Sequence, residues 1–327
     1  MTLIEMMVAV GITSVVVALA LSVVSTGVKL ARQGEQTVQS NEAARGGMEM
    51  LLRDLRLAGL PGGIWVTSVG GPPFRINPVF TAAGAGGSDD VWMVVPRPNS
   101  LQANCASPGS GAVITAAGTG ALTVNCNGTF TTADTLLVSN FTSGALIDGL
   151  SFPSATSITY AQQAVAGFSS SPQKGGYQRG DQVFVVDIIR YRVRLQPTTN
   201  RPVLVRQIGA LAAAPTAAAP FDVPAGSPEQ MFADVEDLQV AFGTGIAPAL
   251  TFASGHTPSY SANAFPVAVR VSVVGVSPRI ILNEQGAPMS FAPVTVEDHV
   301  PSPTVDGYRR SVYRRRVDLL NMNPVNL

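Results

Sequence analysis

An uncharged segment of 23 residues, from Met6 to Val28, lies between Glu5 and Lys29 near the start of the chain. As a helix rising about 1.5 Å per residue, it would span roughly 35 Å, which is enough to cross the hydrocarbon core of a bilayer. A cleaved secretory signal would need a basic region before the apolar run and a small-residue cleavage site after it. The opening Met-Thr-Leu-Ile-Glu does not fit that pattern. We therefore expect residues 1–28 to form a transmembrane helix.

The helix is expected to continue beyond the apolar run. Residues 29–58 contain no proline and carry charges along their length. Large apolar residues recur there at three- and four-residue spacing, namely Met48, Leu51, Leu52 and Leu55. The sequence at 59–63 combines a glycine stop with a proline that cannot continue the hydrogen-bond ladder. We predict one helix of about 58 residues, roughly 85 Å long, whose amphipathic part at 29–59 packs through this leucine stripe on the domain that follows.

The rest of the chain, residues 60–327, is predicted to be a β-rich head. Short runs of β-branched and apolar residues are separated by Gly, Pro, Ser and Asn clusters, as in antiparallel sheets. The predicted strands are 91–95, 112–115, 122–125, 136–138, 182–187, 188–195, 203–206, 235–242, 267–276 and 312–320. The turn at 197–202 predicts a hairpin, and the Ala- and Pro-rich stretch 209–228 predicts a surface linker. The expected fold class is α+β, a long N-terminal helix packed on an antiparallel sheet.

The composition argues against several classes of function. The chain has 21 basic and 21 acidic residues, so it carries no net charge that would attract bulk nucleic acid. The arginine cluster at 309–316 would point to both faces of a strand, so it predicts a solvated edge or an edge that pairs at an interface, rather than a DNA-binding stripe. Two cysteines and two histidines, His256 and His299, lack the spacing of a zinc site. We expect no enzyme activity, no catalytic or metal site and no cofactor.

Two acidic groups, Asp89-Asp90 and Glu297-Asp298-His299, contain residue types that can ligate an ion. Neither has the regular spacing of oxygen ligands found in a calcium loop. We therefore expect exposed turn carboxylates at both places.

Glu5 is the candidate functional residue of the helix. A carboxylate at the start of an apolar segment costs on the order of 2.5 to 3.5 kcal/mol if it is drawn into the bilayer without a partner. The residues alone leave two interpretations open. Glu5 either lies at the headgroup level, favoured by the helix dipole, or enters the membrane and requires a charged partner.

The sequence Thr2-Leu3-Ile4-Glu5 followed by an apolar helix closely resembles the start of mature type IV pilins and pseudopilins. In that family a prepilin peptidase cuts after a leader glycine and releases a hydrophobic first residue, which here is Met1. The resemblance covers the helix as far as Gly59. It implies that the Glu5 carboxylate meets the free α-amine of a neighbouring subunit during assembly, so that two costly charges neutralise each other.

Chain length and three later segments resemble the large minor pilins of the PilW type. Residues 232–243 resemble the strand pattern V-x-x-L-x-[IVLF]-x-[YF]-G of that group, and residues 269–273 resemble the strand that follows it. Residues 313–321 resemble the closing strand, although Leu320-Asn321 lacks the usual basic residue. The resemblance implies a minor pilin, a structural subunit that primes assembly of a type IV pilus or caps its tip.

This resemblance also implies partners and a location. The expected partners are other minor pilins and the major pilin, which contact the N-terminal helix, the prepilin peptidase, and a tip adhesin. The subunit would wait in the bacterial inner membrane with its head in the periplasm, and after assembly it would lie at the tip or base of the pilus. In that oxidising compartment Cys105 and Cys126 are expected to form a disulfide, with two free buried thiols as the alternative.

Two other functions remain open at the level of sequence. A GspJ-type minor pseudopilin of a type II secretion system would use Glu5 in the same way. A membrane-anchored periplasmic binding or hydrolytic domain would instead have a polar pocket around His256 or His299.

Overall fold

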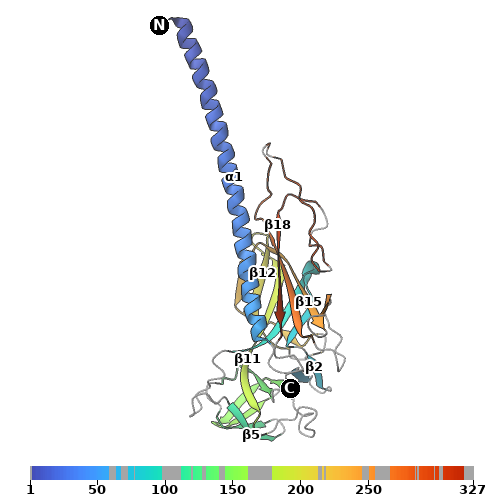
Figure 1. Cartoon of the computed structure of the whole chain (residues 1–327). Helices are drawn as coiled ribbons and strands as arrows, with labels where there is room; N and C mark the ends of the chain where they lie inside the picture. The colour runs from blue at the N-terminus through green and yellow to red at the C-terminus, as the bar shows by residue number, and fades with distance from the viewer. Residues whose placement is uncertain are drawn as a thin grey trace.

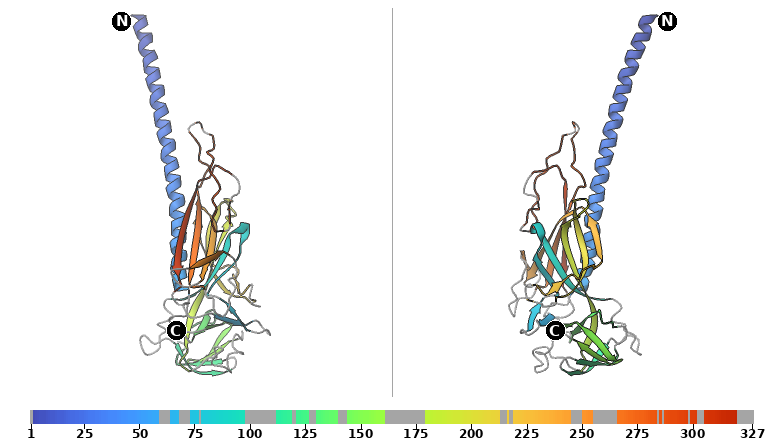
Figure 2. Two further views of the ribbon diagram at one scale, coloured as in Figure 1. Left: turned by 45° about the vertical axis from the view of Figure 1, so that its right-hand side comes forward. Right: turned by 180° about the vertical axis from the view of Figure 1, so that it is seen from behind.

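The computed structural model has one long N-terminal helix followed by a mostly antiparallel β domain, so the fold is broadly α+β (Figure 1). The structure describes residues 2–58, 64–67, 73–76, 78–97, 112–118, 121–126, 130–139, 144–160, 179–212, 216, 219–244, 250–254, 266–283, 285, 287–297, 299–301 and 305–319. The views in Figure 2 show that only the second half of the helix lies beside the β domain, while its first half projects away from it.

Helix α1 runs without interruption from Leu3 to Leu57, which confirms the single long helix expected from the sequence. Thr2 is its N-cap. At the other end Ala58 adopts an extended conformation, and its N–H donates to the carbonyl of Asp54 at 2.8 Å. The glycine and proline stop at 59–63 lies outside the described residues.

A four-stranded antiparallel sheet covers one side of the second half of α1. Its strands are β15 (Val235–Thr244), β16 (Thr251–Ser254), β17 (Ala268–Val276) and β18 (Arg310–Asp318). Their order in the sheet is β16-β15-β17-β18. Three of these strands were expected from the sequence to within a few residues. The last one ends at Asp318 rather than at 320, and Leu319 follows it as a buried residue.

The other strands belong to a larger sheet. They are β1 (Ile64–Thr67), β2 (Pro73–Ile76), β3 (Val79–Ala83), β4 (Asp89–Pro96), β5 (Ala112–Gly118), β6 (Ala121–Val124), β7 (Thr135–Ser139), β8 (Gly144–Ile147), β9 (Leu150–Ser154), β10 (Ser157–Tyr160), β11 (Gln182–Leu195), β12 (Pro202–Leu211), β13 (Phe221–Asp222) and β14 (Glu229–Ala233). A short 3-10 turn, η1 (Ala85–Gly87), joins β3 to β4. The pairing of β1 with β8 is parallel, and the other pairings are antiparallel.

Strand β11 connects two parts of the head. Its first residues pair with β7 and β5, and its later residues pair with β4 and β12. The sequence predicted two strands here, at 182–187 and 188–195, and that division is wrong. Asp187 interrupts the apolar pattern without breaking the strand, because Arg97 pairs with its carboxylate at 2.8 Å.

Alternate residues of β11 serve different cores, as expected for side chains that point to opposite faces of a strand. Val183 and Val185 lie in the core of the distal strands β5 to β10. Ile189, Tyr191 and Val193 lie on the same face farther along and belong to the core beneath α1. On the opposite face, side chains from the first part of β11 belong to a third hydrophobic cluster. The later part of that face carries Arg190, Arg192 and Arg194. The hairpin between β11 and β12 is confirmed.

The stretch 209–228 is more than the surface linker expected from its composition. Strand β12 extends into it as far as Leu211, and β13 pairs with that end. Leu211 and Phe221 are buried in the third cluster. The high Ala and Pro content of this stretch therefore gave no indication of these two core positions. Residues 213–215 lie outside the described residues.

Candidate functional site

The first half of α1 is an exposed apolar surface. From Leu3 to Val28 its large apolar side chains are between 46% and 78% exposed. The helix is long and apolar enough to span a membrane. A continuous apolar surface of this length requires lipid or another protein chain to cover it.

Glu5 takes part in a capping box at the start of this surface. The Thr2 N–H donates to Glu5 Oε2 at 2.9 Å, and the Glu5 N–H donates to Thr2 Oγ1 at 3.4 Å. This reciprocal arrangement satisfies two N–H groups that a helix start otherwise leaves without partners. Among the described residues, the second carboxylate oxygen, Oε1, has no hydrogen-bond partner. Met1, the other residue expected to act in assembly, lies outside the described residues.

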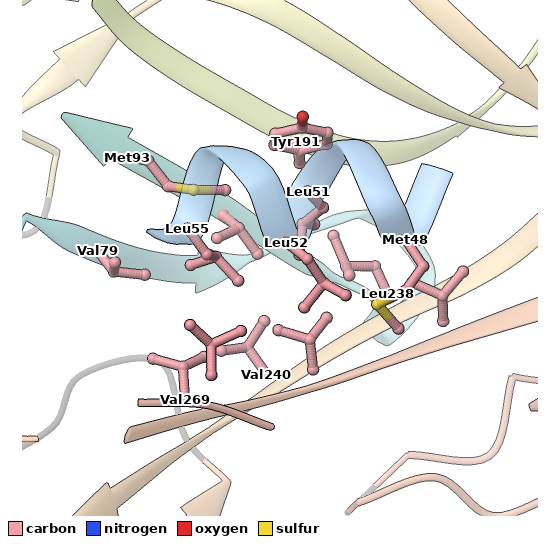
Figure 3. Close-up of a cluster of buried hydrophobic side chains, with 14 of the residues drawn as sticks. Met48, Leu51, Leu52, Leu55, Val79, Met93, Tyr191, Leu238, Val240 and Val269 are labelled. Carbon is pink, nitrogen blue, oxygen red and sulfur yellow. The ribbon is translucent and has the colours of Figure 1, made fainter. Parts of the chain in front are cut away.

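The leucine stripe of α1 lies in the core between the two sheets (Figure 3). Met48, Leu51, Leu52 and Leu55 are all buried. They pack with Val79 and Met93 of the larger sheet and with Leu238, Val240 and Val269 of the four-stranded sheet. Burial of such side chains contributes about 1.5 to 3 kcal/mol each, so this stripe attaches the helix to both sheets.

A buried polar cluster lies beside the stripe. Asp54 Oδ2 accepts hydrogen bonds from the Tyr191 hydroxyl and from Arg206 Nε, both at 2.7 Å. The Asp54 side chain is only 3% exposed, so these partners provide the stabilisation that water would otherwise give to its charge. They come from β11 and β12, and they fix the helix against the larger sheet.

This cluster also changes the ionisation of its members. Burial, and then the negative charge of Asp54, raise the pKa of the Tyr191 hydroxyl above its ordinary value. For Arg206, burial lowers the pKa, but the hydrogen bond and charge of Asp54 outweigh it and leave the pKa raised. The protonated phenol and the charged guanidinium are therefore the forms that the folded state favours.

Gly47 brings the helix close to β12 and β14. A Cβ atom at this position would lie 2.9 Å from Leu204 Cδ2 and 3.4 Å from Phe232 Cγ. The neighbouring Gly46 has more space, since the nearest atom to its Cβ position is Phe232 Cδ1 at 4.0 Å. Only the glycine at 47 is thus required by the close packing of helix and strands.

Asp89, Asp90 and Glu297 are buried or partly buried, so the expectation of exposed turn carboxylates was wrong for them, while Asp298 lies outside the described residues. Asp89 Oδ2 accepts from the N–H of Val240 at 2.7 Å, and Asp90 pairs with Arg190. Glu297, with a side chain only 4% exposed, receives two hydrogen bonds from Arg270. In the part of the chain that the structure describes, no group of three His, Cys, Asp or Glu side chains is placed to hold a metal ion.

His299 packs between Asp237 of β15 and Gly87 of η1. Its Nδ1 lies 2.9 Å from Asp237 Oδ2, whose side chain is fully buried. Its Nε2 faces Gly87, where an added Cβ would come within 2.4 Å of that nitrogen. Gln239 Nε2 donates to Asp237 at 3.0 Å and to the carbonyl of Gly87 at 2.9 Å. These contacts give His299 a structural role in joining β15 to η1. His256 lies outside the described residues.

Members of the arginine cluster at 309–316 form ion pairs. Arg310 pairs with Glu236 and Asp306, both at 2.7 Å. The hydrogen bonds that Arg310 donates to Asp306, together with its pairing to Glu236, outweigh the effect of burial and raise the pKa of Arg310. Arg314 lies 3.5 Å from Glu297, and Arg316 pairs with Asp318 at 2.7 Å. These carboxylates neutralise much of the positive charge along β18.

Cys126 follows β6 and is disulfide-bonded. Cys105, the second cysteine of the sequence, lies outside the described residues. Cys126 is partly exposed, and Leu122 and Val124 of the strand before it lie in the distal core.

Sequence reasoning missed Asp54, Tyr191, Arg206 and Gly47. A signal for Asp54 is present in the sequence, because it lies three residues after Leu51 and therefore on the face that the stripe buries. An acid on a buried helix face predicts a charged partner on the opposing strand. Nothing in the local sequence indicates that Arg206 is this partner.

The chain matches no known protein family, no curated protein and no solved structure. Its function is therefore inferred from the residues and contacts described above.

Proposed function

We propose that this chain is a minor pilin of a type IV pilus, a structural subunit that primes assembly or caps the filament tip. The observation that carries the proposal is the division of α1 into two halves. The apolar half from Leu3 to Val28 is exposed throughout, whereas the half that contains Leu51 and Leu55 is buried in the head. A helix of this kind can remain in a membrane and later pack against the helices of other subunits, while the head stays folded.

Glu5 is proposed to guide assembly. Its capping box uses Oε2, and a carboxylate can accept further hydrogen bonds through both oxygens. An incoming α-amine can thus bind to Glu5 without loss of the helix cap. In an apolar environment, this pairing removes the cost of two isolated charges.

The remaining parts of the proposal follow the pattern of the type IV pilins, which the N-terminal sequence resembles. The chain would be processed by a prepilin peptidase, would wait in the bacterial inner membrane with its head in the periplasm, and would contact other minor pilins and the major pilin through α1. A disulfide between Cys105 and Cys126 would form in the periplasm. None of these roles involves catalysis.

Two variants separate the charge of Glu5 from its capping function. Glu5→Gln removes the charge but retains a side chain that can complete a capping box. Thr2→Ala removes the hydroxyl that accepts from Glu5 but leaves the carboxylate. Each variant is produced in a strain of the source bacterium from which the gene has been deleted, and purified pili and membranes are probed for the protein.

We expect the Glu5→Gln protein to remain in the membrane and the Thr2→Ala protein to enter pili. Entry of the Glu5→Gln protein at the wild-type level would overturn the assembly role of Glu5. Normal pili in the deletion strain together with loss of protein secretion would instead identify a GspJ-type pseudopilin.

A further inference from the structure

The connection between β17 and β18 reaches along α1 toward its N-terminus (Figures 1 and 2). It is attached to the helix by Gln33, whose Nε2 donates to the carbonyl of Leu282 at 2.6 Å. A cavity of about 220 Å³ lies between the two, lined by Thr26, Lys29, Leu30, Gln33, Leu282, Asn283 and Met289. The cavity begins inside the uncharged run, at Thr26, and extends past its end at Val28.

Several apolar side chains of this connection face solvent. Ile280, Leu282 and Met289 are each more than 40% exposed, and Val305 is 60% exposed. They lie in three short stretches, 280–282, 289 and 305–307, which backbone hydrogen bonds join. The Ile281 N–H donates to the carbonyl of Gly307 at 2.9 Å, and the Met289 N–H donates to the carbonyl of Ile281 at 2.8 Å. The apolar side chains therefore belong to one structured surface, which we call the foot.

The position of the foot matches the level at which α1 would leave a bilayer. Lys29 is the first charge after the apolar run, and Arg32 follows within one turn. Basic residues at this level attract anionic headgroups, and exposed apolar side chains beside them enter the boundary between headgroups and acyl chains. The cavity presents Lys29 beside the apolar Leu30, Leu282 and Met289, a combination that suits a phospholipid with its phosphate near the ammonium group.

We propose that the foot is a second membrane contact, and that its cavity binds the headgroup of an anionic phospholipid through Lys29. The proposal rests on the membrane insertion of α1 in the proposed function, and it adds that the head itself lies on the bilayer surface. The foot lies beside the end of the apolar surface of α1, at Val28. If lipid covers the apolar surface of α1, the bilayer surface would also reach the foot, which favours lipid over a protein partner. Contact with lipid holds the head in one orientation before the subunit is extracted.

Tryptophan quenching in vesicles tests this contact with the full chain. Met289→Trp places a probe on the foot, and Ile208→Trp is a matched control because Ile208 is 38% exposed on β12 against 41% for Met289. Val15→Trp reports separately on insertion of α1. Each variant is reconstituted in vesicles of equal parts phosphatidylcholine and phosphatidylglycerol, with and without brominated acyl chains, and the wild-type signal is subtracted.

We expect bromine to quench Val15→Trp and Met289→Trp but not Ile208→Trp. Quenching of Val15→Trp without quenching of Met289→Trp would overturn the foot as a membrane contact and leave the anchor in place. Absence of quenching at both positions would overturn membrane insertion and the foot together. Equal quenching of Met289→Trp and Ile208→Trp would show that the head contacts lipid without specificity, which also contradicts the proposal.

A separate titration tests whether Lys29 binds the phospholipid headgroup. Calorimetric titration of the full chain in an uncharged detergent with a short-chain phosphatidylglycerol should give saturable binding. Lys29→Gln should raise the half-saturating concentration about fivefold, which corresponds to about 1 kcal/mol for one basic residue near an anionic lipid. Arg56→Gln, at the other end of α1, should leave it unchanged. Equal half-saturating concentrations for the two variants would refute the headgroup site.

Discussion

The hydroxyl of Tyr191 donates a 2.7 Å hydrogen bond to Asp54, joining strand β11 to the helix across 137 positions of sequence. The same carboxylate oxygen accepts from Arg206 of the next strand. One buried carboxylate thus fixes both the rotation of α1 about its axis and its position along the sheet. The leucine stripe alone specifies these less strictly, because apolar contacts have no direction.

Replacing Asp54 with Ala should lower the free energy of unfolding by about 3 to 5 kcal/mol, because Arg206 would keep its charge in a site with little access to water. The matched control is Arg53→Ala, whose side chain is 61% exposed beside Asp54 and which should change stability by less than about 0.5 kcal/mol. Denaturant unfolding of the full chain in detergent measures both. Similar losses for the two variants would show that the buried cluster does not stabilise the attachment.

Stability should fall at alkaline pH because of Tyr191. The pKa of its hydroxyl is raised in the folded state, so above about pH 10 the unfolded chain releases a proton that the folded chain retains. This contribution is complete below pH 10 and decreases by up to about 1.4 kcal/mol for each further pH unit.

Tyr191→Phe removes this group. The variant should lose less stability than the wild type between about pH 9.5 and about pH 11, as measured by denaturant titrations across that range. Parallel curves for the two proteins would contradict a raised pKa at Tyr191.

Replacing Leu52 with Asp should unfold the head or detach the helix. The change removes about 1.5 to 3 kcal/mol of apolar burial and places a charge in the core between the sheets. Glu49→Ala removes only a surface pair with Arg45, in which both side chains are more than 60% exposed, and should have little effect. Thermal melting of the two variants gives the comparison. Equal melting temperatures would mean that the stripe does not support the fold.

The adjacent glycines of α1 should respond differently to alanine. Gly46→Ala should stabilise the protein by about 0.5 to 1 kcal/mol, because alanine favours the helix and the added methyl group has space. Gly47→Ala gains the same helix propensity but must displace Leu204 and Phe232 in a packed core. The Gly47 variant should therefore melt at a lower temperature than the Gly46 variant. The reverse order would show that the helix does not approach β12 this closely.

The sequence predicts the features of this fold that depend on local periodicity. The uncharged run and the stripe at Met48 to Leu55 define the helix and its buried face, and the alternation in β11 defines the hairpin with β12. Contacts between distant segments could not be predicted in this way. Asp89 resembles a turn residue in its own sequence, yet its carboxylate bonds to the N–H of Val240 on another sheet. Asp187 resembles the end of a strand in its own sequence, but its carboxylate pairs with Arg97 and the strand continues through it.

The long strand β11 determines how the head would respond to a force applied through α1. Its later residues are bonded to β12 and β4 beneath α1, and its first residues are bonded to β7 and β5 of the distal part. A force that separates these two parts acts along the strand, and the hydrogen bonds between antiparallel strands lie across that direction. Many bonds must then break together rather than one after another. The distal strands are therefore joined to the rest of the head in shear, so that the hydrogen bonds of β11 share the load.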